Sequence, residues 1–307
     1  MTTSTKPNLH AYQGEVWALA SAFSYAFSTL FLRVAVRDYE LNYLMGTVLR
    51  ATPTFLFALA MGMRAQTRAA GAVSPFSDWR LAALLVGYGV ATFIVGNPIY
   101  FQALQIGGVA VATPVVGTMA LWSALIAAVF LKQSLTLKMA GGILVTVAGI
   151  ALLGFGQLGG QAISAEWWLA IPLALLTALS WSASGVLVAA AMARGVDRFR
   201  ALAVATGSGI LLLNLALLLG GDISVYASTP LRIHAAVLAG GLLNAMALVS
   251  VTTALSLTTV ASATTINSLQ IGLAPLLAWL VLGEGLNPLM VAGVTVIVIG
   301  VIVVQWR

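Results

Sequence analysis

The chain has 307 residues, of which 61% are hydrophobic and only 7% are charged. Soluble domains carry about 25% charged residues, so most of this surface cannot face water. The net charge of +6 comes from 14 scattered Lys and Arg residues that form no nucleic-acid-binding patch. There is no cysteine, which excludes disulfides and thiolate sites, and the two histidines, His10 and His234, lie far apart in the sequence. We therefore expect no metal site, no cofactor and no nucleic-acid partner.

Ten apolar runs follow one another along the chain, separated by charged residues or by Pro and Gly clusters. Each is long enough to cross about 30 Å of hydrocarbon as a helix. In lipid the backbone must satisfy its own hydrogen bonds, which favours helices, and the runs lack the alternation of barrel strands. The predicted spans are 14–36, 42–63, 80–104, 108–131, 136–155, 166–193, 201–220, 231–257, 260–282 and 288–306. Two predicted connections, 105–108 and 257–259, are very short and carry no charge.

The positions of Lys and Arg predict how the chain is oriented in the bilayer. If the N-terminus is cytoplasmic, ten basic residues fall on the cytoplasmic side: Lys6, Arg64, Arg68, Arg80, Lys132, Lys138, Arg194, Arg198, Arg200 and Arg307. Three fall on the opposite side, namely Arg33, Arg37 and Arg232. The positive-inside rule then predicts that both termini are cytoplasmic. Residues 1–13 are expected to form a cytoplasmic tail, because the apolar run that follows is too long for a cleaved signal peptide.

An internal repeat relates the two halves of the chain. A shift of 151 residues places 103–150 on 254–301 without a gap, and about 15 of the 48 pairs are identical, including matched Gly, Thr and Met positions. Shared Ala, Leu and Val content alone would give about a third as many matches. A shift of 156 residues aligns 21–25 with 177–181. Because each half holds five spans, an odd number, the second half must enter the membrane from the opposite side, as in the inverted repeats of secondary transporters.

The fold that these patterns predict is an all-α polytopic membrane protein. Its ten transmembrane helices form two inverted five-helix repeats. The expected divisions are the tail 1–13, a first repeat 14–157 and a second repeat 158–307. Glycines spaced seven residues apart, Gly142 with Gly149 and Gly293 with Gly300, are typical of helix-packing faces.

The end of the chain resembles the end of an EamA domain. Residues 282–288 read Leu-Gly-Glu-Gly-Leu-Asn-Pro and precede a small-residue helix, as in the L-G-E-x-L motif of that domain. The pairs at 103–104 and 254–255, both Ala-Leu, resemble its Ala-Leu pair, and Arg50 resembles its arginine in helix two. The first half departs from the pattern at 131–135, which reads Leu-Lys-Gln-Ser-Leu, and the second half has no counterpart of Arg50.

Over residues 14–305 the chain therefore resembles the drug/metabolite transporter superfamily, in its ten-helix EamA-domain form. Within that superfamily it is most similar to bacterial aromatic amino acid exporters of the YddG type. The resemblance implies a multi-pass protein of the bacterial inner membrane that exports aromatic and other apolar amino acids by alternating access. It implies the lipid bilayer and a small molecule as partners, and it leaves the oligomeric state open, a monomer being sufficient.

Polar side chains recur on one side of two predicted helices. The first span carries Ser21, Ser24, Tyr25 and Ser28 at helical spacing, and the sixth span repeats the pattern with Thr177, Ser180, Trp181 and Ser184. Small polar residues often serve to let helices approach and bond one another. Alternatively, the two stripes line a central, largely uncharged cavity in which Tyr25 and Trp181 stack on an aromatic substrate.

Amide side chains extend this candidate cavity. An Asn or Gln inside a span must point into protein or a cavity, because a lipid-facing amide would be unpaired. At 100° per residue, Phe93, Asn97 and Tyr100 share one arc of the third span. The predicted cavity residues are Ser24, Tyr25, Ser28, Phe93, Asn97, Tyr100, Trp181, Ser184, Asn244, Asn267 and Gln270. Amides and hydroxyls beside aromatic rings would suit a zwitterion with an apolar side chain, while interhelical bonding is the alternative.

Charge inside the spans separates the candidate functions. Arg50 is the one ionisable residue well inside a predicted span, where it could snorkel to the outer interface or contact a substrate carboxylate. Glu15, Glu166 and Glu284 all lie near span ends, which disfavours a carboxylate proton relay. The same lack of a buried acid disfavours the nearest rival, an exporter of quaternary ammonium or other drug cations. A membrane-embedded enzyme would need a catalytic cluster that the sequence lacks, and inverted repeats with short loops disfavour a channel or a receptor.

Overall fold

The structure, a computed structural model, describes residues 12–35, 39, 41–68, 73–157, 166–283 and 285–305. In this part of the chain it contains helices and no strand, apart from one isolated bridge between Val73 and Val196. The helices are α1 (Gln13–Ala35), α2 (Tyr43–Arg68), α3 (Trp79–Gly89), the π-helix η2 (Val90–Gly96), α4 (Asn97–Gly117), α5 (Met119–Phe130), α6 (Leu137–Gln157), the 3₁₀ turn η4 (Trp167–Leu169), α7 (Ala170–Ala193), α8 (Arg198–Leu219), α9 (Val225–Ser228), α10 (Leu231–Leu257), α11 (Val260–Asn267), α12 (Leu269–Leu282) and α13 (Pro288–Gln305). The predicted all-α fold is confirmed.

The helices have the lengths that a bilayer requires. Nine stretches within the described residues are long and apolar enough to cross a membrane. Helix α1 adds a tenth helix of 23 residues, about 35 Å at 1.5 Å per residue. The chain is therefore a multi-pass membrane protein with the number of helices that the sequence predicts.

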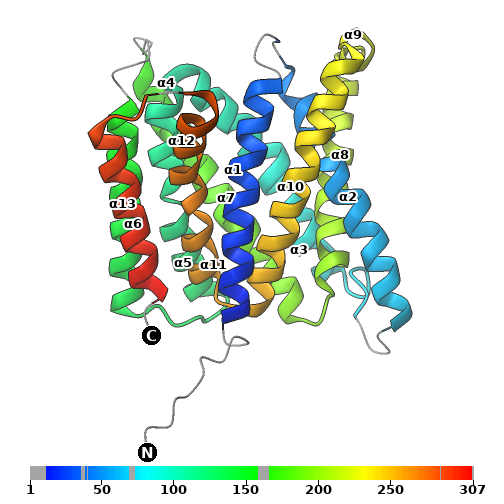
Figure 1. Cartoon of the computed structure of the whole chain (residues 1–307). Coiled ribbons are helices and arrows are strands. Elements are labelled where there is room, and N and C mark those ends of the chain that lie inside the picture. The colour runs from blue at the N-terminus through cyan, green and yellow to red at the C-terminus, as the bar shows by residue number, and fades with distance from the viewer. Residues whose placement is uncertain are drawn as a thin grey trace, which may run out of the picture.

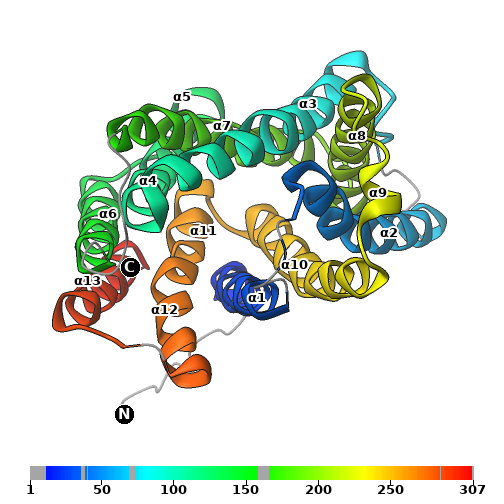
Figure 2. The ribbon, with the colours of Figure 1, turned by 90° about the horizontal axis from the view of Figure 1, so that it is seen from above.

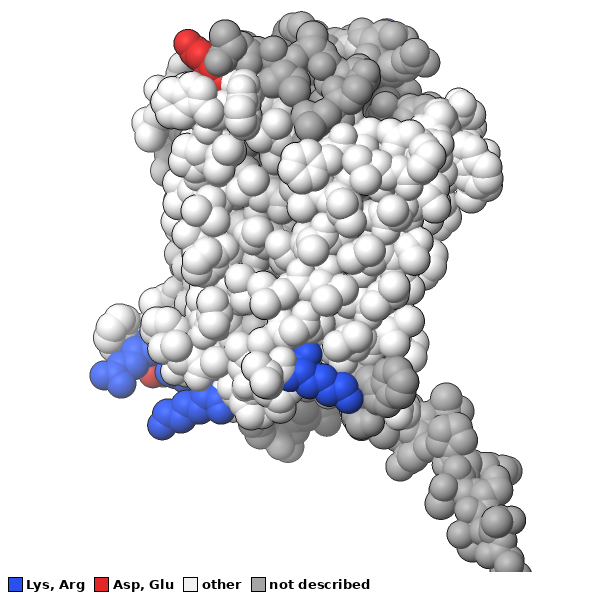
Figure 3. All heavy atoms as spheres, turned by 90° about the vertical axis from the view of Figure 1, so that its left-hand side faces the viewer, with Lys and Arg blue, Asp and Glu red and all other residues white. Residues whose placement is uncertain are grey.

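The outer surface of the bundle is apolar through its middle. Large side chains such as Leu242, Met246 and Ile302 are more than half exposed, at 62%, 60% and 51%. The face in Figure 3 shows no charged side chain across its middle and carries Lys and Arg at its lower edge. Trp79 and Trp168 are exposed near helix starts, where aromatic belts lie in membrane proteins. This exterior is suited to hydrocarbon and not to water.

Helices of one half pack against their repeat partners in the other half. Helix α2 packs against α8, α5 against α11 and α6 against α13, while α1 pairs with α10 as α7 pairs with α3, η2 and α4. Seen from above, α6 and α13 close one end of the molecule, and α2 and α8 close the other (Figure 2). A two-fold axis in the membrane plane gives this set of pairs.

The two halves run in opposite directions. Gly14, at the start of α1, lies so close to Thr258 that an added Cβ would be 2.7 Å from it. The end of α7 lies at the same end of the molecule, because Ala189 shares a packed cluster with Val260. Thus α7 ends on the side of the molecule where α1 begins. The last helix, α13, ends on that same side (Figure 1).

One predicted connection differs from the sequence expectation, and the other is confirmed. Helical turns continue through 105–108, where a connection was predicted, although the chain does reverse near this point. Before the reversal the chain runs antiparallel to α7, and after it the chain runs parallel. Helix α4 therefore carries the end of the third span and the start of the fourth. The connection at 257–259 is confirmed, because α10 ends at Leu257 and α11 begins at Val260.

Glycines let α6 and α13 approach closely. A Cβ added to Gly149 would lie 2.5 Å from the Ile297 nitrogen and 2.9 Å from the Gly293 carbonyl oxygen. A Cβ on Gly142 would lie 2.9 Å from the Gly300 carbonyl oxygen. Only residues without a side chain fit at these positions, which confirms the predicted packing faces.

The inverted topology predicts opposite labelling of two exposed serines. Because the chain has no cysteine, Ser134→Cys and Ser224→Cys each introduce a single thiol, one in the connection before α6 and one at the start of α9. In intact cells, a membrane-impermeant maleimide should label Ser224→Cys, and in inside-out vesicles it should label Ser134→Cys. Labelling of both from the same side would contradict the topology.

The tight glycine interface predicts a position-dependent effect of one methyl group. Gly149→Ala should lower the stability of the protein by about 1–3 kcal/mol, because overpacking forces backbone shifts. Gly141→Ala, in the same helix with nothing within 4 Å of its added Cβ, should leave stability unchanged or slightly raised. Thermal unfolding of the two variants in the same detergent gives the comparison, and equal midpoints would contradict the close packing of α6 and α13.

Candidate functional site

A polar stripe of α7 bonds to the backbone of the π-helical segment η2. The Thr177 hydroxyl lies 3.1 Å from the Leu173 carbonyl of its own helix and 3.4 Å from the Gly96 carbonyl, so it can donate to either, and the Ser180 hydroxyl donates to the Ala91 carbonyl at 2.6 Å. Side chains that bond a neighbouring helix in this way hold two helices together within a bilayer. For these two residues, the structure shows the packing role that was one of the two sequence-based alternatives.

Trp181 lies at the centre of a cluster of aromatic and amide groups. Its indole N–H donates to Asn97 Oδ1 at 3.2 Å, and its ring meets that of Tyr100 nearly edge-on, with centroids 5.2 Å apart. Such an edge-to-face pair is a favourable geometry for two rings. Gly96 provides the space, because a Cβ there would overlap the indole. The structure thus brings together three of the predicted cavity residues, from α4 and α7.

Helix α1 repeats this arrangement against α10 and α11. The Ser21 hydroxyl lies 2.9 Å from the Ala247 carbonyl and 3.0 Å from Asn267 Oδ1, so it can donate to either. The Ser28 hydroxyl donates to the Gly240 carbonyl at 3.0 Å. Ser21 is the repeat partner of Thr177, and Ala247 is the repeat partner of Gly96. The two polar stripes are therefore related in their contacts as well as in their sequence.

Arg50 of α2 points into the protein. Its Nη2 donates to the Ser28 hydroxyl at 3.4 Å, and the guanidinium lies within electrostatic range of the Tyr25 and Tyr100 hydroxyls. Its Nε is buried and finds no acceptor among the described residues. The bond to Ser28 of α1 favours the inward-pointing alternative for Arg50 over snorkelling to the outer interface.

Acidic residues of the described chain lie away from the middle of the spans. Each one stands within the first turn of a helix or in a connection: Glu15, Asp78, Glu166, Asp197 and Asp222. Glu284 lies outside the described residues. Within the described helices, Arg50 therefore has no mid-span carboxylate to balance its charge.

Other predicted cavity residues lie apart from this cluster. Phe93 is 4% exposed and packs in a core between α3, α7 and α8. Ser184 donates to a carbonyl one turn earlier in its own helix. Asn244 is buried in α10, while Ser24 in α1 and Gln270 in α12 are half-buried.

Two helix breaks in the middle of spans escaped the sequence analysis. The fourth span is interrupted at Thr118 and the ninth at Ser268, which are repeat-related to within one residue. Each hydroxyl bonds to a carbonyl three or four residues earlier, at 2.6 and 3.0 Å. Small polar residues at matching mid-span positions were the signal that could have revealed them. Discontinuous helices at the repeat interface are where transporters place their binding sites.

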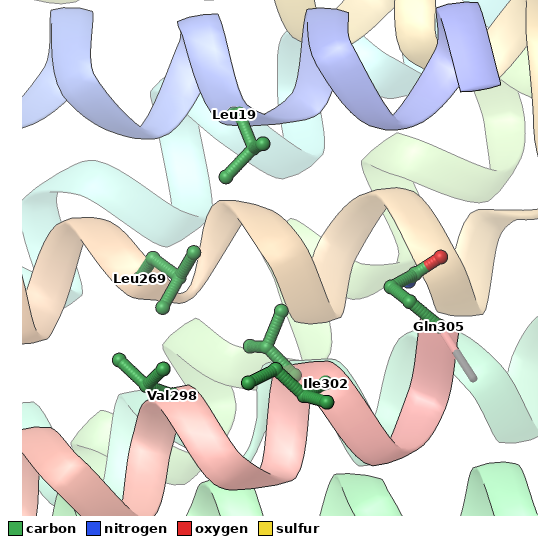
Figure 4. A pocket seen from close by; sticks show the side chains of 6 residues that line it. Leu19, Leu269, Val298, Ile302 and Gln305 are labelled. Atoms are coloured by element: carbon green, nitrogen blue, oxygen red, sulfur yellow. The ribbon is translucent and has the colours of Figure 1, made fainter. Parts of the chain in front are cut away.

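A separate groove lies on the outer side of α1, α12 and α13 (Figure 4). It has a volume of about 430 Å³ and is lined by Leu19, Leu269, Val298, Val301, Ile302 and Gln305. Its walls are almost entirely apolar, and none of the cluster residues described above lines it. We therefore place the candidate site at the Trp181 and Arg50 groups between the two halves, and not in this groove.

The chemistry of the site is that of binding. The part of the chain that the structure describes holds no group of three His, Asp or Glu residues that could bind a metal ion. Aromatic rings, an amide and one cation, drawn from α1, α2, α4 and α7, meet instead between the two halves. Apolar walls with a few placed polar groups are the usual composition of small-molecule sites.

Ten helices in two inverted repeats, with polar groups meeting between the halves, define a membrane transporter. The sequence matches the profile of the EamA-like transporter family twice, over residues 12–155 and over 168–306. The chain belongs to this family and carries its domain in duplicate.

A comparison with solved structures gives the same fold. One solved structure, described only as the crystal structure of a protein, aligns with a TM-score of 0.75 at 18% sequence identity, over 94% of this chain and 95% of that one. At this identity the likeness shows the fold alone. No match is found among curated proteins.

The close contact between the Trp181 indole and Gly96 gives a direct test of the cluster. Gly96→Ala should displace the Trp181 ring and break its bond to Asn97, at a cost of about 1–3 kcal/mol in stability. Gly185→Ala is the matched control on α7, because nothing lies within 4 Å of its added Cβ. Thermal unfolding measures both, and a Gly96→Ala variant as stable as the control would contradict the described contact.

Proposed function

We propose that the chain exports small metabolites, aromatic and other apolar amino acids foremost, across a bacterial inner membrane by alternating access. Membership of the EamA-like family supports transport of small molecules. The substrate class, the outward direction and the inner-membrane location come from the resemblance to aromatic amino acid exporters, and they are part of the proposal. The observation that carries it is the cluster of Trp181, Tyr100 and Asn97 beside Arg50.

The cluster suits an aromatic side chain. The Tyr100 and Trp181 rings already meet at 5.2 Å, so a third ring could pack against the same pair. Asn97 holds the indole through its Oδ1 and keeps its own amide donors for a ligand. A ligand with an apolar ring at one end and a polar group at the other would find both kinds of partner here.

The paired breaks at Thr118 and Ser268 suit alternating access. Each interrupts a helix in the middle of its span while keeping right-handed helical dihedrals, and we propose these points as the places where the two parts of the helix bend. At one end of the molecule the two repeats are joined by a hydrogen bond from the Val260 N–H to Gln133 Oε1 at 3.0 Å. Ala127 and Val186 pack beside this contact. We propose this end, which is cytoplasmic under the positive-inside rule, as the closed gate.

A drug cation is a weaker candidate for the substrate. Aromatic rings can hold a cation through their faces. Arg50, however, places a positive charge beside the same rings, and like charges in a low-dielectric site repel strongly. The charge of the site therefore favours the amino acid proposal over the cation proposal.

Substitution of the cluster should reduce transport without preventing insertion. In proteoliposomes, Trp181→Ala and Asn97→Ala should each lower the rate of labelled phenylalanine transport at low concentration by about 5- to 30-fold, equivalent to 1–2 kcal/mol of lost binding. Trp279→Ala, at an exposed tryptophan near the end of α12, should transport at the wild-type rate. Wild-type rates in both cluster variants would remove these residues from the site, and no amino acid transport by the wild-type protein would overturn the proposed substrate class.

A further inference from the structure

The charges and hydrogen bonds around Arg50 indicate which chemical group of the ligand the site recognises. We propose that the site recognises a carboxylate and does not read an ammonium group, so that its ligands are aromatic or apolar monocarboxylic acids with or without an amino group. This inference rests on the proposed function for the position of the site. It makes the carboxylate, and not the amino group, the part of the substrate that the site requires.

Most hydrogen-bond donors of the Arg50 guanidinium have no acceptor among the described residues. The guanidinium has five N–H donors, yet among the described residues it makes one hydrogen bond, a contact of 3.4 Å to the Ser28 hydroxyl, and its buried Nε has no acceptor there. Ser28 gives its own proton to the Gly240 carbonyl, so its oxygen can only accept from Arg50. A guanidinium with a buried donor left unpaired is costly, and an added anion would relieve that cost.

A carboxylate is the group that fits these free donors. Two parallel N–H donors of a guanidinium match the two oxygens of a carboxylate, in the strongest common geometry for a charged hydrogen bond. The Tyr25 and Tyr100 hydroxyls interact electrostatically with the guanidinium, and the Tyr100 hydroxyl also bonds to Thr113. The Tyr25, Arg50 and Tyr100 side chains come from α1, α2 and α4, so the anion would lie between helices and away from lipid.

Tyr100 joins the charged end of the site to its aromatic end. Its hydroxyl interacts electrostatically with Arg50, and its ring meets that of Trp181 nearly edge-on. A ligand bound to Arg50 by its carboxylate can therefore place an attached ring beside Trp181. This adjacency requires an acid that carries an apolar group, and not a small inorganic anion.

An ammonium group finds no comparable partner. The acidic residues of the described chain lie at helix starts and connections, away from Arg50. Asn97 Oδ1, the amide oxygen beside the Trp181 and Tyr100 rings, has one of its two lone pairs engaged by Trp181 and carries no formal charge to offset that of an ammonium. Arg50 itself repels a cation. The amino group of an amino acid would therefore add little to binding, and an amine without a carboxylate would bind poorly.

Four ligands with the same ring test this inference on the purified full chain. They are 3-phenylpropionate, phenylalanine, phenylalaninamide and phenylethylamine, and the readout is thermal stabilisation, since a ligand that binds the folded state raises Tm. The two acids should stabilise the protein at similar concentrations, whereas the amide and the amine should need about 10-fold more or fail. Phenylethylamine binding as well as 3-phenylpropionate, or phenylalanine binding without 3-phenylpropionate, would overturn the inference.

Variants of Arg50 locate the effect. Arg50→Gln should lower affinity for both acids by about 10-fold or more and remove the preference over phenylalaninamide, while Arg50→Lys should retain part of that preference. Arg232→Gln removes the same charge from an exposed position and should behave as wild type. A preference for acids that survives Arg50→Gln would overturn the assignment, and the ligand series on the wild-type protein remains decisive if that variant does not fold.

The outcomes separate this inference from the proposed function. Binding of 3-phenylpropionate without any phenylalanine transport would support the carboxylate site and overturn amino acid export. Phenylalanine transport with tight phenylethylamine binding would do the reverse. If none of the four ligands binds, both proposals fail.

Discussion

A polar group inside a bilayer must find its partner within the protein, and this constraint organises the structure. Ser21, Ser28, Thr177 and Ser180 all turn their hydroxyls to backbone carbonyls of a neighbouring helix. These bonds fix α1 on α10 and α7 on η2, and the two pairs form the walls between the halves. Arg50 departs from the rule, because it is only partly satisfied. A departure of this kind marks the place where a ligand can complete the set of partners.

The fold could be read from the sequence because the bilayer leaves few alternatives. Apolar runs of span length require helices, and the offset of 151 residues between matched segments predicts the pairing of repeat partners. The role of the glycines at 142, 149, 293 and 300 as packing positions could be predicted for the same reason, since close helix contacts in lipid need small residues. The sequence was least informative at 105–108, where helical turns continue through the chain reversal.

The candidate site was less accessible to sequence reasoning. Trp181 could be singled out because it lies mid-span in a polar stripe, and the structure places it beside Asn97 and Tyr100. Phe93 was assigned to the cavity from helical periodicity alone, whereas the structure packs it in the core between α3, α7 and α8. The direction of Arg50 was beyond the sequence as well. Whether a long side chain points to the interface or inward depends on the helices around it, which only the packed structure supplies.

The π-helix η2 makes the two halves of the protein structurally different. The described first repeat contains η2, whereas α10, its counterpart, is an uninterrupted α-helix from Leu231 to Leu257. A carrier made of two identical halves would have inward-facing and outward-facing forms of equal free energy. Here the exchange of roles between the halves places the wider helix on opposite sides of the passage in the two forms. Under the proposed alternating access, the empty protein would have a preferred resting orientation, and the bound ligand would have to offset that preference before the opposite side could open.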